Sequence, residues 1–191
     1  GREALFAELD LSQSVGWFTS LYPVVLQAAD GWAATIKATK EQLRQVPNGG
    51  LGYGLLKYLQ GAELPALDEA LLFNYLGRVE ASGELFTLAD EPSGAQRDGG
   101  APLACALALD SQVRDGCLQL TCTYSRERFA AARIQALLNQ YRTALVELVE
   151  HCRTQSAVTP SDFPHVQLRQ TELDSLPLPA RQVEDIYPLT P

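Results

Sequence analysis

The chain has 191 residues, of which 46% are hydrophobic and 20% are charged, and these proportions are ordinary for one soluble globular domain. Its formal net charge of −8 argues against a nucleic-acid ligand, because no basic stripe is present to neutralise phosphates. No apolar run reaches the roughly 20 residues that a membrane-spanning helix needs, and no signal peptide is visible. The sequence starts at Gly1-Arg2-Glu3 and contains no Met, so we expect it to be a piece of a longer protein.

The first part of the chain predicts one strand followed by two helices. Residues 15–29 are rich in aromatic and β-branched residues and predict a strand that Pro23 interrupts. A helix is predicted from about 31 to 46, and the turn residues at 47–50 end it. A second, short helix is expected over 52–59.

A buried strand is predicted over residues 68–77, and it ends in the block Phe73-Asn74-Tyr75-Leu76-Gly77-Arg78. A carboxamide at this position would be held rigidly beside a glycine, which lets another group approach the backbone closely. An isolated buried Asn is usually satisfied by its own backbone, and that alternative stays open here. A short strand at 84–88 and a polar loop at 90–102 follow.

The next segment predicts a hairpin and a long helix. Residues 103–113 and 117–124 are strand-like, and Asp115-Gly116 between them is a favoured two-residue turn. A helix that Ser125 caps then runs to about residue 152. The apolar residues expected on the inner face of the second strand are Leu118, Leu120, Cys122 and Tyr124. The expected apolar stripe of the helix comprises Phe129, Ile134, Leu137, Leu138, Tyr141, Leu145, Leu148 and Val149.

Residues 154–191 differ from the rest because they contain six prolines and little periodicity. This composition predicts a linker rather than core, with one short helix at 171–176.

Simple catalytic and ligand motifs are missing from the sequence. The glycines at 49, 50, 52 and 54 fit neither phosphate-loop nor dinucleotide spacing, and they favour a tight connection between two helices. No Ser-His-Asp or Cys-His arrangement is convincing. The spacing of the cysteines and histidines fits no zinc template, so we expect no metal, and we interpret the cysteines as reduced residues of a cytoplasmic protein. These residues are Cys105, Cys117, Cys122, Cys152, His151 and His165.

Four segments in order resemble the later motifs of epimerization domains from nonribosomal peptide synthetases, over roughly residues 1–152. They are Gly1-Arg2-Glu3, Val15-Gly16-Trp17-Phe18-Thr19 with Tyr22-Pro23, Pro47-Asn48-Gly49-Gly50-Leu51-Gly52-Tyr53-Gly54, and Phe73-Asn74-Tyr75-Leu76-Gly77. Residues 159–164 and 186–191 resemble the junction from such a domain into a condensation domain. The chain departs from the family at Gln13-Ser14, where Arg-Thr is usual, and at Arg78, where Gln is commoner.

The resemblance implies an α/β fold like that of chloramphenicol acetyltransferase, in which a mixed or antiparallel sheet is packed by helices and the active site lies between two similar lobes. It assigns residues 1–153 to the C-terminal lobe and 154–191 to an extended linker toward a following condensation domain. The HHxxxDG histidine and the EGHGRE glutamate, proposed as the acid and base of the family, are not in this sequence, and Glu3 is only the last letter of the second motif. We therefore expect this fragment to be inactive alone.

The resemblance also implies the reaction, which is inversion at the Cα of an aminoacyl or peptidyl thioester on a carrier domain. It assigns Asn74 to a donor for the enolate oxygen, with Tyr75 beside it. The expected residues of the substrate and pantetheine channel are Trp17, Phe18, Thr19, Tyr22, Gly50, Gly52, Tyr53 and Gly54.

The expected cofactor is the 4′-phosphopantetheine of the carrier domain, with no metal and no nucleotide. The expected partners are the missing N-terminal lobe, an upstream carrier domain and a downstream condensation domain, and the exposed lobe interface predicts self-association. Two alternatives remain open: a lobe of an amide-forming condensation domain, and a non-catalytic lobe that docks carrier domains.

Overall fold

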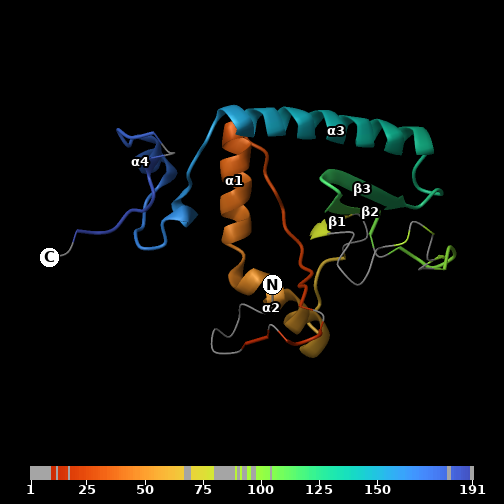
Figure 1. Cartoon of the computed structure of the whole chain (residues 1–191). Helices are drawn as coiled ribbons and strands as arrows, with labels where there is room; N and C mark the ends of the chain where they lie inside the picture. Colours follow the sequence, from red (N-terminus) through yellow and green to blue (C-terminus); the bar gives the residue numbers. More distant parts are fainter. Residues whose placement is uncertain are drawn as a thin grey trace. The chain divides into compact units, whose positions relative to one another are not determined.

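The fold is described from a computed structural model of the chain (Figure 1). The chain forms two compact units: the first comprises Gly1–Leu64 and Tyr141–Pro191, and the second comprises Pro65–Gln140. None of the described helices has both the length and the apolar composition needed to cross a membrane. The structure describes residues 10–11, 13–16, 18–66, 70–79, 89, 91, 94–95, 98–103, 105–179 and 182–189.

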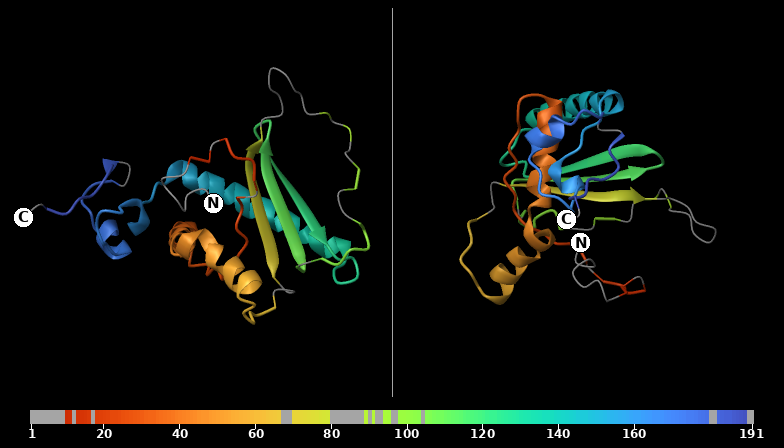
Figure 2. Two further views of the ribbon diagram at one scale, coloured as in Figure 1. Left: turned by 90° about the horizontal axis from the view of Figure 1, so that it is seen from below. Right: turned by 90° about the vertical axis from the view of Figure 1, so that its left-hand side faces the viewer.

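The described part of the second unit is built on a mixed sheet of three strands. β1 (Leu71–Val79) pairs in parallel with β2 (Leu107–Arg114), and β2 pairs antiparallel with β3 (Cys117–Tyr124). Figure 2 shows the three strands side by side, with the first part of α3 (Ala131–Thr154) along one face of the sheet. The predicted α/β architecture is confirmed, whereas the short strand expected at 84–88 lies outside the described residues.

Side-chain alternation gives this sheet an apolar and a polar face. Leu109 of β2 and Ile134 of α3 are only 6% and 5% exposed and form the centre of the apolar side. Exposed threonines alternate with half-buried residues along β3, as predicted, although Leu118 near the hairpin is 43% exposed. The half-buried residues of β3 are Leu120, Cys122 and Tyr124.

The predicted hairpin is confirmed at Asp115 and Gly116, whose φ angles of 51° and 75° are those of a tight turn with two left-handed residues. The strand before it is shorter than expected, since β2 begins at Leu107 rather than at residue 103.

Helix α3 begins later than predicted, so the assignment of Ser125 as its cap is wrong. The Ser125 carbonyl accepts the N–H groups of Arg128 and Phe129 at 3.2 and 3.0 Å and thereby closes a separate turn. The hydrogen-bond ladder of the helix starts instead at the Ala130 carbonyl. The predicted stripe is confirmed at Ile134, Leu138, Tyr141, Leu145 and Leu148, whereas Leu137 and Val149 are 39% and 53% exposed.

The first unit contains the two predicted helical regions. α1 (Trp32–Arg44) corresponds to the first, and α2 (Leu51–Gly54) with the π-helical turn η3 (Leu55–Leu59) corresponds to the second. The short η2 (Pro47–Gly50) between them contains three successive residues with positive φ, at Asn48, Gly49 and Gly50. This left-handed stretch follows the end of α1 and redirects the chain toward α2.

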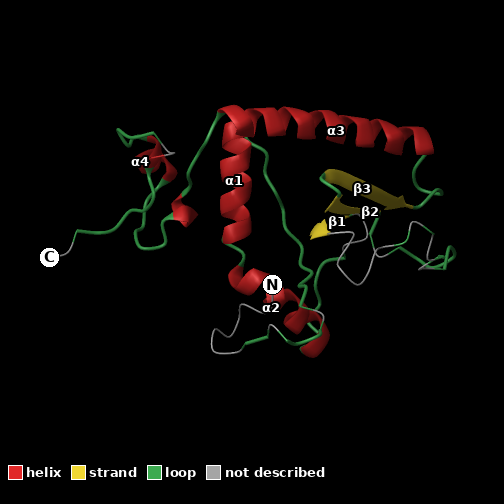
Figure 3. Ribbon diagram, in the orientation of Figure 1, coloured by secondary structure: helices red, strands yellow, loops and turns green. Residues whose placement is uncertain are grey.

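The strand predicted over 15–29 is wrong for the residues that the structure describes, which form a loop before α1 (Figure 3). Side chains of α1 satisfy part of its backbone in place of a neighbouring strand. The Gln27 N–H donates to the Gln42 side chain at 3.1 Å, and the Ala29 N–H donates to Thr35 Oγ1 at 3.1 Å.

The C-terminal segment contributes to the core of the first unit, which corrects the expectation of a linker without core residues. Phe163 and Leu173 are 2% and 4% exposed. They lie beside η4 (Pro160–Asp162) and in α4 (Gln170–Asp174), the latter close to the helix predicted at 171–176. Composition did not reveal this packing because isolated apolar anchors between prolines have no periodicity. Whether the segment connects to a condensation domain stays a prediction.

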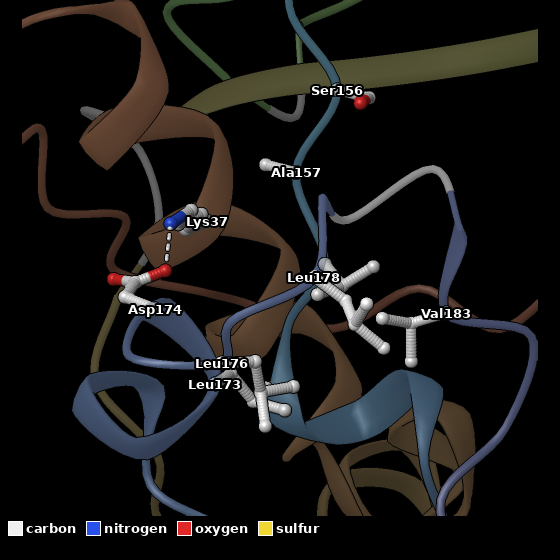
Figure 4. Close-up of a pocket in the computed structure, with 9 residues that line it drawn as sticks. Lys37, Ser156, Ala157, Leu173, Asp174, Leu176, Leu178 and Val183 are labelled. Atoms are coloured by element: carbon white, nitrogen blue, oxygen red, sulfur yellow. Dashed lines mark hydrogen bonds and ion pairs between the residues drawn. The ribbon is translucent and has the colours of Figure 1, made fainter.

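Charged side chains of α1 hold this segment in place, and we refer to the contacts as the α1 latch. Lys40 Nζ lies 2.5 Å from both carboxylate oxygens of Asp162, and the Ser161 N–H donates to Glu41 Oε1 at 3.2 Å. A further ion pair joins Lys37 to Asp174 at 2.6 Å. Figure 4 shows this pair at a cavity of about 150 Å³ whose apolar lining includes Leu173, Leu176, Leu178 and Val183.

The latch lowers the pKa of two carboxyl groups. Burial raises the pKa of Asp162, but hydrogen bonds from Lys40 and from the Thr159 N–H outweigh this, and the net pKa lies below the usual value. Burial likewise opposes ionisation of Glu41, and hydrogen bonds from Ser161 and Thr159 outweigh it, so its pKa is also lowered. Both groups therefore bind protons more weakly in the folded state than in the unfolded state.

We predict that Asp162→Ala lowers the free energy of unfolding by about 1–2 kcal/mol, because it removes a helix-capping acceptor and an ion pair together. The matched control is Asp174→Ala, which should cost less because the Asp174 side chain is 52% exposed against 32% for Asp162. Urea unfolding of the chain measures both. Equal stability of Asp162→Ala and wild type would contradict the latch.

The same contacts predict an acid-sensitive stability. Because the folded pKa values of Glu41 and Asp162 are depressed, their contribution is complete above the unfolded carboxyl pKa of about 4. It is lost as the pH falls through the lower folded values. Unfolding midpoints measured between about pH 6 and pH 3 should therefore fall less steeply for Asp162→Ala than for wild type.

Candidate functional site

The Asn74 side chain is fixed by a neighbouring strand. Asn74 of β1 lies opposite Asp110 of β2 in the parallel register, and its Nδ2 donates to Asp110 Oδ1 at 3.1 Å. The hydroxyl of Ser111, a residue only 3% exposed, donates to the Asn74 backbone carbonyl at 3.5 Å. The carboxamide is thus bound to a neighbour rather than to its own backbone, and it is half-buried.

The environment of the block around Asn74 corrects two expectations. The block lies inside β1 rather than at its end, and its aromatic residues are not buried, since Phe73 and Tyr75 are each 54% exposed. Consecutive residues of a strand point to opposite faces, so β1 places Tyr75 on the face opposite to Asn74 and not beside it. The role of Tyr75 in the reaction stays a prediction.

A bulge follows directly after these residues. The pairing of β1 with β2 shifts register between Tyr75 and Arg78, and Gly77 within the shift has a φ of 80°. Glycine adopts this conformation without the steric cost of a Cβ atom. The bulge thus interrupts the regular pairing just beyond Asn74, and pairing resumes at Arg78 and Val113.

The face of the sheet that carries Asn74 is rich in amides and hydroxyls. Register places Asp110 opposite Thr121, and Gln112 Nε2 donates to Gln119 Oε1 at 3.1 Å on the same face. These groups supply hydrogen-bond donors and acceptors, and none of them is an imidazole or a thiol. The Asn74–Asp110 pair is suited to orienting a polar ligand rather than to transferring protons, whereas Gln112 and Gln119 are paired with each other.

In the first unit, the structure brings together two of the predicted channel residues, Tyr22 and Gly50. Gly50 is buried and has a φ of 79°, and a Cβ atom built on it would overlap the Tyr22 ring. Both the backbone conformation and the packing therefore require glycine here.

The other two glycines of this segment have different surroundings. No described atom lies within 4 Å of a Cβ built on Gly52 or Gly54. The Tyr53 hydroxyl between them is buried and has no hydrogen-bond partner among the described residues. A buried hydroxyl without a partner is uncommon in proteins.

The remaining predicted channel residues are only partly described. Trp17 lies outside the described residues. Phe18 is half-buried and its ring packs near Gly16, whereas Thr19 is exposed. Their roles stay predictions.

The structure also reveals a candidate residue that the sequence analysis missed. Asp110 lies in an unremarkable strand sequence, Leu107-Ala108-Leu109-Asp110-Ser111, and 36 positions from Asn74. The only available signal was a charged residue at the centre of a predicted strand. Its partner could not be identified, because the sequence does not give the register between distant parallel strands.

The four cysteines are free, as expected. Burial raises the pKa of the Cys122 thiol, which keeps it protonated and poorly reactive at neutral pH. This supports its interpretation as a small structural side chain.

Comparison with known proteins identifies the family. The condensation-domain family model matches residues 1–168. The chain therefore belongs to the condensation-domain family, whose members include domains of nonribosomal peptide synthetases.

The relatives are large synthases. The chain is 39% identical over 204 residues to one of the linear gramicidin synthase subunits of Brevibacillus parabrevis, a match that covers 100% of this chain and 3% of that protein. It is 35% identical over 184 residues to surfactin synthase subunit 2 of Bacillus subtilis (strain 168), covering 92% and 5%. The chain thus spans a few per cent of the length of these relatives.

A solved structure gives the fold match. The chain resembles the crystal structure of the epimerization domain from the third module of tyrocidine synthetase B, with a TM-score of 0.69 and 34% sequence identity. The match covers 80% of this chain and 36% of that chain. This confirms the fold class inferred from the motifs.

We predict that Gly50→Ala destabilises the chain by at least about 2 kcal/mol, because it combines a strained left-handed residue with a clash against Tyr22. Gly52→Ala is the matched control, and it should be neutral or stabilising by up to about 1 kcal/mol, since it replaces glycine in a helix with open space around it. Thermal and urea unfolding measure both. Equal effects of the two substitutions would show that the Tyr22 contact is unimportant.

Proposed function

We propose that this chain is part of an epimerization domain, which inverts the Cα of an aminoacyl or peptidyl thioester attached to a carrier domain. The observation that carries the proposal is the structural match to a solved epimerization domain over four fifths of the chain. The order of the motifs, from Gly1-Arg2-Glu3 to Phe73–Gly77, supports the same subtype within the family.

The chemistry sets three requirements. The α-proton beside a thioester is only weakly acidic, so one group must remove it and another must return a proton to the opposite face. The negative charge that develops on the enolate oxygen also needs fixed hydrogen-bond donors. In this proposal the acid and the base are the HHxxxDG histidine and the EGHGRE glutamate, which the 191 residues do not contain.

We assign the third requirement to Asn74. A primary amide carries two N–H groups, and only one is needed for the bond to Asp110. The second N–H is free to donate to the thioester or enolate oxygen. A donor whose orientation is fixed before the reaction stabilises the developing charge without reorganisation.

The substrate is carried on the 4′-phosphopantetheine arm of the carrier domain, which supplies the thioester. The residues that suit such an arm are those with spare hydrogen-bonding capacity or open space beside them. Tyr53 offers a buried hydroxyl without a partner among the described residues, and Gly52 and Gly54 leave room for a close approach. We assign Trp17, Phe18, Thr19, Tyr22 and Gly50 to the wall of the same channel.

The proposed partners follow from the relatives, which are synthase subunits far longer than this chain. They are the N-terminal lobe of the same domain, an upstream carrier domain and a downstream condensation domain. We also propose a cytoplasmic location, which the four free cysteines support.

The test uses the complete domain that contains this chain, together with its loaded carrier in deuterated solvent. We expect exchange of the α-hydrogen and conversion of L to D substrate. Amide-bond formation without either would instead establish the alternative, a condensation domain, which is compatible with the same family model. The 191-residue chain alone should exchange no α-hydrogen above the spontaneous rate.

We predict that Asn74→Ala and Asn74→Asp in the complete domain each lower the exchange rate by about 10²–10³, the usual effect of losing one preorganised donor. Gln119→Ala is the matched control, because it removes an exposed carboxamide from the same face of the sheet. Exchange rates within about threefold of wild type for both Asn74 variants would exclude the assigned role.

A further inference from the structure

We propose that Asp110 is a positioning residue that fixes the orientation of the Asn74 carboxamide and so determines which atoms of Asn74 face the substrate. This inference rests on the proposed function for its effect on the reaction, whereas the orientation itself is a property of the folded chain. Asp110 belongs to none of the motifs that indicated the family.

The two side chains are held together by the sheet. Asn74 and Asp110 are register partners in parallel strands, so their side chains leave the backbone on the same face. A second hydrogen bond holds the main chain of Asn74: the Ser111 hydroxyl donates to the Asn74 backbone carbonyl at 3.5 Å. Asn74 is therefore anchored at its main chain and at its side chain by consecutive residues of β2.

The chemistry of the pair leaves one orientation of the amide. A carboxylate accepts hydrogen bonds and donates none, so the Asn74 nitrogen must face Asp110 and the oxygen must point away. The reversed amide would bring its carbonyl oxygen against the carboxylate, and the two negative groups would repel each other. Asp110 thereby removes the rotational freedom that an exposed carboxamide would otherwise have.

This orientation has a consequence for recognition. The N–H that is not bonded to Asp110 is presented at a fixed angle to any acceptor on the polar face. A hydroxyl or a shorter side chain in place of Asp110 would not hold this Asn74 N–H at that angle. We therefore expect the effect of Asp110 on catalysis to pass entirely through Asn74.

The geometry also argues against a role in folding alone. Asp110 lies at the middle of the central strand, where β-branched or aromatic residues are favoured and Asp is disfavoured. Its neighbours two positions away on the same face are Ala108 and Gln112, so the position does not belong to the apolar core. An acidic residue here is explained by its partner rather than by strand stability.

The experiment compares Asp110→Ala with Asp110→Asn in the complete domain with its loaded carrier. Asp110→Ala removes the acceptor and should lower kcat for α-hydrogen exchange about tenfold with little change in KM. Asp110→Asn keeps an oxygen that can accept the same hydrogen bond, but it also gains an N–H that can pair with the reversed amide, so its rate should lie between those of wild type and Asp110→Ala. Gln112→Ala, which breaks the Gln112–Gln119 bond on the same strand and face, is the matched control and should leave the rate unchanged.

Two further measurements separate positioning from general destabilisation. In an Asn74→Ala background, Asp110→Ala should change the exchange rate by less than about twofold, because Asp110 affects the rate only through the Asn74 carboxamide. Independently of activity, the side-chain amide protons of Asn74 in a ¹⁵N-labelled sample should show one strongly downfield proton in wild type, a smaller downfield shift in Asp110→Asn and none in Asp110→Ala.

Full additivity of the two substitutions, or an Asn74 amide signal that Asp110→Ala leaves unchanged, would overturn the inference. If Asp110→Ala folds poorly, Asp110→Asn keeps the test decisive, because an Asn74 amide signal identical to that of wild type would overturn the inference. Failure of the proposed function is recognised separately: the complete domain would then form amide bonds without exchange, while the Asn74 signal would still depend on Asp110.

Discussion

The parallel register between β1 and β2 is the constraint on which the candidate site depends. It places Asn74 against Asp110 and the Asn74 carbonyl near Ser111. Because side chains alternate along a strand, shifting the β1–β2 register by one residue would move the Asn74 side chain to the opposite face of the sheet and break both contacts. The register is regular up to Tyr75 and shifts beyond it, where Gly77 takes a positive φ. The bulge thus changes the register only after the residues that make these contacts.

The first unit depends on a comparable constraint at Gly50. Its left-handed conformation turns the chain between α1 and α2 and leaves space that the Tyr22 ring fills. The same α1 carries the lysines and the glutamate that bind the C-terminal segment through Asp162, Asp174 and the Ser161 N–H. The chain up to Asp174 is therefore part of the folded unit and not an appendage to it.

Membership of the condensation-domain family establishes the fold but not the reaction, because one fold supports several chemistries. The distinction between amide formation and epimerization lies in the groups around the thioester. The polar face of the sheet offers a carboxamide held by a carboxylate. In the proposed reaction this pair stabilises charge, and other groups transfer the protons.

The sequence by itself determined the family, the helices of the first unit and the hairpin at Asp115-Gly116, because these depend on local patterns of residues. It failed for the loop before α1, where side chains of the helix satisfy the backbone, and for the C-terminal segment, whose buried Phe163 and Leu173 follow no period. Only the tertiary structure decided that Asp110 holds Asn74 and that Tyr75 points to the other face. The physical reason is that pairing between strands 36 positions apart is a long-range choice, which no local pattern encodes.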